Sequence, residues 1–281
     1  MDRYVFVILH YNTLDDTMEC VESIEKVCGQ ASYHIIVVDN CSPNGSGTEL
    51  KRRFADKSRV TVLLNSKNLG FARGNNVGFA YAKKVLHPDF IILLNNDTVL
   101  FQEDFLHLIS KTYQMYGYAV LGPMILTADG RCDSSPLSYG PLDRASVQQQ
   151  IQAVKLRLFC AKYHLLWTSV LYKRILKRKS VRPRPYLEQQ NVKLHGSFMI
   201  FSRLYIDQFD GLDSRTFMYA EEDFLQKRLQ DYHMMSLYCP QLVIYHKEGS
   251  STQHTYRNNR KKYIFFWENS LKSLQLLLSD F

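Results

Sequence analysis

The sequence predicts an α/β fold in which a mostly parallel central sheet is flanked by helices. Short apolar runs rich in Val and Ile alternate with stretches of helical apolar spacing through the first hundred residues. This alternation is typical of a parallel sheet that helices cover on both faces. The chain has 281 residues, of which 46% are hydrophobic, so it can bury a full core.

The predicted elements follow one another in a regular order. The first strands are residues 4–9, 34–38, 60–64 and 90–94, and the helices between them are residues 15–27, 47–55 and 75–85. The later elements are a helix at 103–116, a strand at 119–121, loops over 122–141, a helical segment at 151–184, a strand at 197–201, a helix at 221–229 and a strand at 242–245.

Each of the first four predicted strands ends in polar residues. These tips are His10-Tyr11-Asn12, Asp39-Asn40, Asn65 and Asn95-Asn96-Asp97. In an open α/β sheet, ligands bind beyond the carboxyl ends of the strands. The four tips are therefore expected to converge on one crevice.

Asp97 directly follows an apolar strand, at the expected mouth of this crevice. Mg²⁺ or Mn²⁺ is often held by one or two carboxylates, with waters and phosphate oxygens as the other ligands. The alternative is that Asn96-Asp97-Thr98 caps the next helix. Asp39 can likewise accept hydrogen bonds from a pyrimidine base or from ribose, or it can belong to an ordinary turn.

Three further groups of residues are candidates for chemistry. Asn68 to Asn76 combine two glycines, amides and Arg73 at a helix start, which suits a diphosphate. Glu221-Glu222-Asp223 open a helix after an apolar tripeptide, so they are either dipole-favoured cap residues or an acid poised to take a proton. His246 ends a strand, where it is either structural or a metal ligand.

The net charge of +8 is concentrated in residues 151–184, which hold ten Lys or Arg and no acid. Apolar and aromatic residues are interleaved with these cations. This pattern fits a helix on an anionic membrane surface, and it fits equally an amphipathic insert that packs on its own domain. No nucleic-acid recognition module is present, so nucleic acid is not an expected partner.

The apolar runs also bear on location. The longest are about six residues, far below the roughly 18 that span a bilayer, and no charged-then-apolar leader is evident. The six cysteines are scattered without paired spacing, which argues against disulfides and zinc. We expect a cytoplasmic protein with reduced thiols.

These stretches together resemble family 2 glycosyltransferases of the GT-A fold, in the rhamnosyltransferase-like branch of bacterial surface-polysaccharide synthesis. The matching segments run from Val5 to His246 in the order of the family, and they include Asn68-Leu69-Gly70-Phe71-Ala72-Arg73-Gly74-Asn75-Asn76 and Leu93-Leu94-Asn95-Asn96-Asp97-Thr98. The family's Glu-Asp pair reads Glu221-Glu222 here. Asn95 stands where a first Asp is often found.

The resemblance implies the role of each candidate residue. Glu222 is expected to be the catalytic base, with Glu221 beside it, and Asp97 and His246 are expected to hold Mg²⁺ or Mn²⁺. The implied nucleotide-sugar site consists of Tyr11, Asn12, Asp39, Asn40, Asn68, Arg73, Asn76, Asn96 and Asp97.

The resemblance and the order of the predicted elements also suggest a domain organisation. Residues 1–255 are expected to form one GT-A domain, and residues 256–281 a C-terminal helical extension. Within the domain, residues 1–125 form the nucleotide-sugar half, 140–190 the basic helical insert and 191–255 the acceptor and catalytic half.

The resulting prediction is an inverting, metal-dependent transferase. It moves a hexosyl or deoxyhexosyl group from a UDP or dTDP sugar to a glycan or a lipid-linked oligosaccharide. The anionic inner surface of the cytoplasmic membrane is a further expected partner. One alternative is a nucleotidyltransferase, but that class needs a glycine-rich loop directly after the first strand, and residues 10–14 contain no glycine. The other alternative is a catalytically silent module that docks on membranes.

Overall fold

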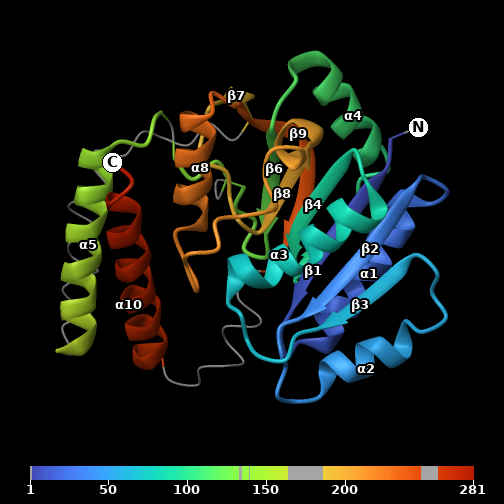
Figure 1. The fold of residues 1–281 in the computed structure, drawn as a ribbon, viewed down its shortest axis with the longest axis horizontal. Coiled ribbons are helices and arrows are strands. Elements are labelled where there is room, and N and C mark those ends of the chain that lie inside the picture. The colour runs from blue at the N-terminus through green and yellow to red at the C-terminus, as the bar shows by residue number, and fades with distance from the viewer. Residues whose placement is uncertain (1, 133–134, 139, 164–185, 248–258) are drawn as a thin grey trace.

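The structure is a computed structural model that describes residues 2–132, 135–138, 140–163, 186–247 and 259–281. A nine-stranded mixed sheet forms its centre, and helices lie on both faces (Figure 1). The strands are β1 (Tyr4–His10), β2 (Tyr33–Asp39), β3 (Val60–Leu64), β4 (Phe90–Asn95), β5 (Thr98–Val99), β6 (Val120–Thr127), β7 (Gln189–Gln190), β8 (Phe198–Ser202) and β9 (Ser236–His246). The helices are α1 (Leu14–Cys28), α2 (Ser46–Arg53), α3 (Phe71–Tyr81), α4 (Phe105–Tyr116), α5 (Arg144–Lys162), α7 (Arg203–Ile206), α8 (Glu221–Asp231) and α10 (Asn259–Leu278), with a π-helical turn, η1, at Ala82–Leu86.

The first half of the sheet is parallel, as the sequence predicts. Strand β1 pairs in parallel with β2 and with β4, and β2 pairs in parallel with β3. The register aligns His10 with Asp39, and Leu9 with Asn95. The polar ends of these strands therefore meet at one edge of the sheet.

The second half adds shorter antiparallel ladders, so the mostly parallel sheet is mixed and not purely parallel. Strand β8 pairs antiparallel with β4 and with β6, whereas β6 and β9 are parallel. Strand β6 continues to Thr127 through a region expected to be loop. The ladder shifts register between Pro123 and Met124, which is where a strand tolerates proline.

Buried apolar side chains form a cluster on each face of the sheet. Helices α1 and α4 cover one face, and Ile24 and Phe105 are fully buried there. Helices α3, α7 and α8 cover the other face with residues such as Phe79, Tyr205 and Leu229. The residues at the strand ends are thus carried by a rigid, fully packed sheet.

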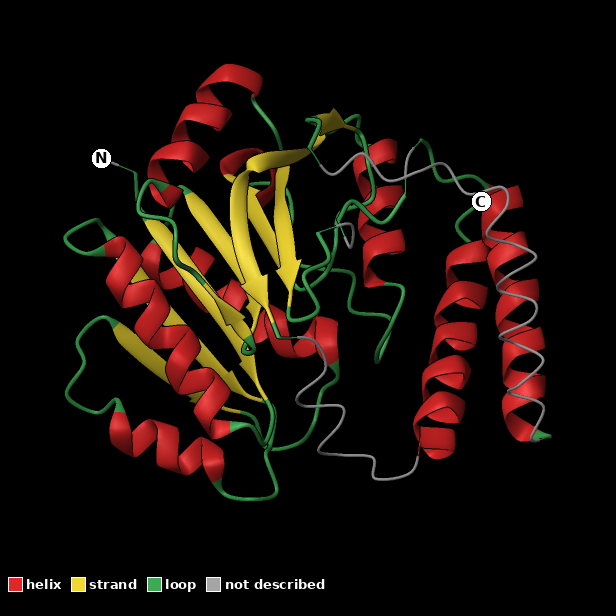
Figure 2. Ribbon diagram, turned by 180° about the vertical axis from the view of Figure 1, so that it is seen from behind, coloured by secondary structure: helices red, strands yellow, loops and turns green. Residues whose placement is uncertain are grey.

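Helices α5 and α10 run antiparallel and form a pair beside α8 (Figures 1 and 2). Their shared apolar cluster includes Val147, Ile151, Leu277 and Phe224 of α8. The described part of the basic segment, up to Lys162, therefore packs on the protein itself. Residues 164–185 of that segment lie outside the described residues.

No helix in the described part of the chain is both long enough and apolar enough to cross a membrane.

Candidate active site

A cavity of about 860 Å³ lies between the carboxyl edge of the sheet, the start of α8 and the α5–α10 pair. Its lining combines polar residues from strand ends with aromatic residues from the helical pair. The residues that line the cavity include Tyr11, Asn40, Asn68, Asn95, Asn96, Asp97, Arg157, His195, Gly196, Tyr219, Glu221, Glu222, Asp223, His246, Phe265, Phe266 and Trp267. The cavity is large enough for a nucleotide-sized ligand.

Asp97 and His246 form a buried pair in this cavity. The Nε2 atom of His246 lies 3.1 Å from Oδ1 of Asp97, and the residues are 6% and 5% exposed. Backbone pairing fixes this contact, because β5 and β9 align Thr98 with His246. The amide of Lys247 also donates to the carbonyl of Asp97 at 3.0 Å.

The Asp97–His246 pair has the donor set that Mg²⁺ or Mn²⁺ accepts, one carboxylate and one imidazole. Within the described residues, Nδ1 of His246 is buried and has no hydrogen-bond partner. A buried polar atom without a partner is costly, so this imidazole retains unused capacity for a ligand. Among the described residues, no three His, Cys, Asp or Glu side chains gather as a complete metal site. The residues therefore fit a cation that is completed by diphosphate oxygens and water.

His195 belongs to this site, although the sequence analysis did not single it out. Its Nδ1 accepts the amide of Ser197 at 3.1 Å, so we assign the ring proton to Nε2. The ring packs edge-on against His246, with 6.1 Å between the ring centroids. Burial, followed by the nearby His246, lowers the pKa of His195 to about 4, so the ring is neutral near pH 7. The only signal in the sequence is its position just before the strand that begins at Phe198.

Glu221 and Glu222 bring two carboxyl groups into the cavity at the first turn of α8. Oε1 of Glu222 accepts the amide of Gly196 at 3.2 Å, and Glu221 accepts the Thr216 hydroxyl at 3.4 Å. A Cβ on Gly196 would lie 2.5 Å from Oε1 of Glu222, so only glycine allows this approach. Burial raises the pKa of both carboxyls, and the charge of Glu222 helps to raise that of Glu221 to about 8.

The segment before α8 is strained. Tyr219 and Ala220 both have left-handed backbones, with φ of 72° and 67°. Such backbones cost energy in residues other than glycine and are held in place by their surroundings. They turn the chain so that the N-terminus of α8, with its partial positive charge, faces the cavity.

Asp223, the third acid of this cluster, is already paired. It accepts Nζ of Lys193 at 2.9 Å and Nε2 of Gln150 at 3.3 Å. It therefore ties α8 to the chain before β8 and to α5.

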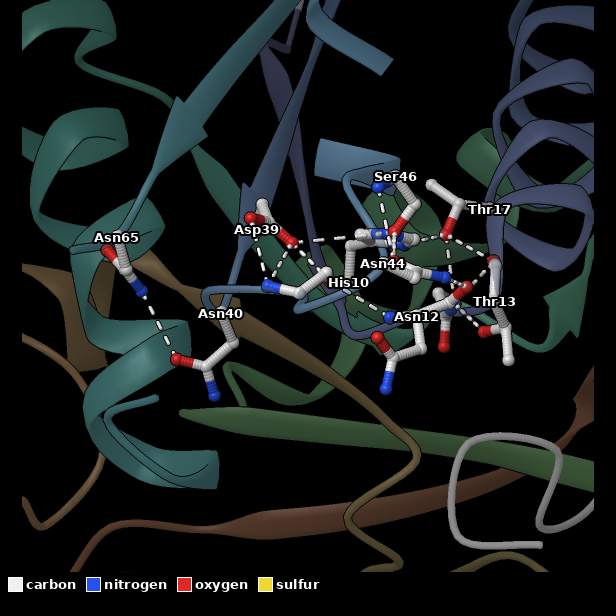
Figure 3. A network of polar contacts seen from close by, with 11 residues as sticks. His10, Asn12, Thr13, Thr17, Asp39, Asn40, Asn44, Ser46 and Asn65 are labelled. Carbon is white, nitrogen blue, oxygen red and sulfur yellow. Dashed lines mark hydrogen bonds and ion pairs between the residues drawn. The ribbon is translucent and has the colours of Figure 1, made fainter. Parts of the chain in front are cut away.

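Four of the predicted nucleotide-sugar residues do not line the cavity: Asn12, Asp39, Arg73 and Asn76. Asp39 is engaged in a network with the loop that follows it (Figure 3). Its carboxylate accepts the amide of Ser42 at 3.2 Å and also the Ser42 hydroxyl. Beneath it, the fully buried His10 joins the hydroxyls of Thr17 and Ser46, each at 2.7 Å.

Arg73 and Asn76 project from α3 toward a loop near the cavity. Nε of Arg73 donates to the carbonyl of Ser214 at 2.6 Å. The amide group of Asn76 both donates to and accepts from the backbone of Leu212, at 2.8 Å in each case. Both side chains therefore position the segment that leads to Tyr219.

Asn40, Asn68 and Asn96 line the cavity and also hold its walls. Asn40 donates to Asn68 and to the carbonyl of Gly70, each at 3.0 Å, and accepts the amide of Leu69 at 2.9 Å. Asn96 donates to the hydroxyls of Thr13 and Thr17 at 2.7 and 2.9 Å. The amide side chains thus fix the loops at the polar end of the cavity.

The family model described as "Glycosyl transferase family 2" matches residues 5–174, which is more than half of the chain. The chain belongs to this family. The match includes β1, β2, β4 and the Asn95 to Asp97 turn, so it covers Asn40, Asn96 and Asp97 but not His246. Membership of family 2 does not favour a nucleotidyltransferase or a silent membrane module.

Two similar proteins are themselves glycosyltransferases. A low-salt glycan biosynthesis hexosyltransferase from Haloferax volcanii is 24% identical over 79% of this chain and 60% of that protein. An N-acetylglucosaminyl-diphospho-decaprenol L-rhamnosyltransferase from Mycobacterium tuberculosis is 24% identical over 82% of this chain and 73% of that protein. The chain thus spans less than two thirds of the length of the archaeal relative.

Solved structures support the GT-A fold. A mannosyltransferase from Pyrobaculum calidifontis, in complex with GDP-Man and Mn²⁺, matches 99% of this chain and 74% of that chain, with 13% identity and a TM-score of 0.55. S. aureus TarS in complex with UDP matches 87% of this chain and 60% of that chain, with 13% identity and a TM-score of 0.54.

Proposed function

We propose that this chain is an inverting glycosyltransferase that transfers a hexosyl or deoxyhexosyl group from a nucleoside diphosphate sugar to an acceptor hydroxyl. One observation carries the proposal. The Asp97–His246 pair and the Glu221–Glu222 pair line the same cavity. In a direct displacement at an anomeric carbon, a bound cation would stabilise the departing diphosphate and a carboxylate would take the proton of the acceptor hydroxyl.

The donor occupies the polar end of the cavity in this proposal. Asp97 and His246 would hold Mg²⁺ or Mn²⁺, and the bound cation would supply positive charge to the departing diphosphate. The neutral His195 offers its Nε2 proton at the same end. Tyr11, Asn40, Asn68 and Asn96 form the adjoining wall, where a UDP or dTDP base and ribose would lie. Mn²⁺ and GDP-Man in the Pyrobaculum complex, and UDP in the TarS complex, support a donor of this class.

Glu222 is the proposed catalytic base. Its carboxylate takes the proton of the acceptor hydroxyl while the oxygen bonds to the anomeric carbon and the bond to the diphosphate breaks. Burial raises the pKa of Glu222, which makes it a stronger base than a solvated carboxylate. Glu221, with a pKa of about 8, stays protonated near pH 7 and so adds no second charge to the pair.

The acceptor is a glycan or a lipid-linked oligosaccharide in the synthesis of a cell-surface polysaccharide. The mycobacterial relative, an N-acetylglucosaminyl-diphospho-decaprenol L-rhamnosyltransferase, supports this class. The Asp39 network, Arg73 and Asn76 take a positioning role in this scheme, because their side chains bind the loops that line the cavity.

We also propose that the chain associates with the inner face of the cytoplasmic membrane. Helix α5 exposes apolar side chains: Leu156 is 42% exposed, Phe159 is 52% exposed, and Tyr163, just after the helix, is 64% exposed. Lys155 beside them is also exposed. Apolar residues with adjacent cations favour an anionic membrane surface. The wild type should sediment with phosphatidylglycerol vesicles, whereas the variant carrying both Phe159→Ser and Tyr163→Ser should remain in the supernatant. Phe101→Ser, at another exposed aromatic, should sediment like the wild type; equal sedimentation of all three proteins would contradict membrane binding through α5.

Donor binding tests the core of the proposal. Thermal unfolding would be measured with UDP, dTDP and GDP sugars, with and without Mn²⁺, on wild type and Asp97→Ala. A cognate donor should raise the unfolding temperature of the wild type only when Mn²⁺ is present, because ligand binding to the folded state stabilises it. Asp97→Ala should lose this response.

Glu103→Ala is the matched control, because Glu103 is an exposed carboxylate away from the cavity. It should respond to donor and Mn²⁺ like the wild type. An equal response of Asp97→Ala and wild type would remove Asp97 from the donor site.

A further inference from the structure

The cavity has a second end whose chemistry differs from that of the donor end. Aromatic residues of α10, Phe265, Phe266 and Trp267, line it together with Tyr219. The rings of Tyr219 and Phe266 meet edge-on at 4.4 Å, and those of Phe266 and Trp267 also meet at 4.4 Å. This end therefore offers a continuous apolar wall.

Arg157 of α5 is the cation at this aromatic end. Its guanidinium lies over the ring of Trp267, with 4.9 Å between Cζ and the ring centroid. It is half-buried and lines the cavity. Among the described residues, Arg157 has no carboxylate partner, whereas Lys193 near the same cavity is paired with Asp223.

The helix α8 lies between the sheet and the α5–α10 pair in both ribbon views (Figures 1 and 2). Glu221 and Glu222 open this helix, while Asp97 and His246 lie on the sheet and Arg157 lies on the helical pair. The catalytic carboxyls are thus carried by the element between the two ends. A donor on the sheet side and an acceptor on the helical side would meet at Glu222.

We propose that Arg157, stacked on Trp267, binds a phosphate group of the acceptor, and that the neighbouring aromatic wall of α10 receives the apolar chain attached to that phosphate. The assignment rests on the proposed function and narrows its acceptor to a phospholipid-linked sugar, as opposed to a neutral glycan. A guanidinium binds phosphate oxygens through two parallel hydrogen bonds, and stacking on Trp267 holds its plane in place. A neutral glycan would add no counter-ion for this half-buried cation, which has no carboxylate partner among the described residues.

Trp267 itself reports on the site. The chain has two tryptophans, and Trp167 lies outside the described residues. Trp167→Phe leaves Trp267 as the single tryptophan reporter. Fluorescence titrations in EDTA would use octyl diphosphate, neutral octyl glucoside and inorganic diphosphate, all below micelle-forming concentrations. EDTA suppresses diphosphate binding at the cation site of Asp97 and His246.

Octyl diphosphate should change the Trp267 emission and bind at least tenfold more tightly than inorganic diphosphate, which lacks the chain. Arg157→Gln in the same background should weaken octyl diphosphate at least tenfold and leave octyl glucoside unchanged. Arg157→Lys, which keeps the charge but not the fork, should recover only part of the affinity. Arg144→Gln, at an exposed arginine of the same helix, should behave like the parent.

Two results would overturn this assignment. Unchanged octyl diphosphate affinity in Arg157→Gln would make the Arg157 stacking purely structural. Equal affinity for octyl diphosphate and inorganic diphosphate would remove the lipid chain from the site. Donor binding with Mn²⁺ is measured separately on Arg157→Gln: wild-type donor affinity is expected, and a matching loss of donor affinity would move Arg157 to the donor site. If no donor stabilises the wild type, the proposed function is overturned. The octyl diphosphate titration would still test phosphate binding by Arg157, because it uses no donor.

Discussion

Two regions border the cavity, and they use their polar groups differently. At the edge of the sheet, Asn40 satisfies both ends of its amide within the protein, and His10 uses both ring nitrogens. At the start of α8, Glu221 accepts the Thr216 hydroxyl and Glu222 accepts the amide of Gly196, and burial raises the pKa of both carboxyls. The polar groups of the first region therefore stabilise the loops around the cavity, whereas the carboxyl groups of the second region are the proposed site of proton transfer.

The largest expected effect tests the proton-transfer role on the α8 side. Glu222→Gln keeps the size and the hydrogen bond to Gly196 but cannot take a proton. Turnover should fall by roughly 10²- to 10⁴-fold, the usual contribution of a general base, while metal-dependent donor binding stays at the wild-type level. Glu22→Gln, at an exposed glutamate of α1, is the control. Retained turnover in Glu222→Gln would move the base to another acid.

A structural prediction concerns the contact between the two regions. Gly70 has φ of 82°, and a Cβ there would lie 1.9 Å from the carbonyl oxygen of Phe217. Gly70→Ala should therefore cost about 3 kcal/mol in the free energy of unfolding, since it adds backbone strain to a clash. It should also weaken turnover, because Phe217 leads directly into the strained Tyr219 and Ala220.

Gly45→Ala provides a matched control for that experiment. Gly45 has φ of 76°, but a Cβ there meets nothing within 4 Å. It should cost only about 1 kcal/mol, the strain alone. Chemical denaturation of both variants measures the difference, and equal losses would mean that the Gly70–Phe217 contact carries no energy.

The smallest expected effect is the pH dependence of stability, which should have opposite signs in the two regions. Burial raises the pKa of Glu221 to about 8, so its contribution to stability is complete below its unfolded pKa of 4.5 and is lost as pH rises through about 8. Burial lowers the pKa of His10 to about 4, so its contribution is complete above 6.5 and is lost as pH falls through about 4.

Glu221→Gln isolates the first of these contributions. Between about pH 6 and pH 7.5 the wild type should lose on the order of 1 kcal/mol per pH unit more than Glu221→Gln. Denaturant titrations at several pH values measure the two slopes. Parallel slopes would show that the Glu221 carboxyl titrates alike in the folded and unfolded chain.

The sequence predicted the parallel half of the fold and much of the polar end of the cavity. Strand tips such as Asn96 and Asp97 could be placed because parallel strands bring their carboxyl ends to one edge. Arg73 and Asn76 could not be placed in the same way. Helix α3 begins at Phe71, so Arg73 lies within its first turn, and both side chains turn toward the backbone of residues 212–214. Composition gave no indication of this direction.

Long-range packing accounts for the other differences. The sequence predicts a strand only over residues 242–245, whereas the parallel ladder with β6 extends β9 back to Ser236. His195 and Arg157 acquire their surroundings from β9 and α10, far along the chain. Local patterns do not encode which distant element a side chain will meet, so these two residues became candidates only in the folded structure.

The register between β5 and β9 has a consequence for how this molecule can diverge. Main-chain pairing of Thr98 with His246, and of Lys247 with Asp97, helps to set the distance between Asp97 and His246, the proposed cation-binding pair. Within the intervening segment, strand β6 also pairs with His246 through Thr127, whereas α5, α8 and the proposed base lie outside this ladder. Helices α5 and α8 can therefore vary for new acceptors, while the ladder keeps the geometry of the proposed donor end.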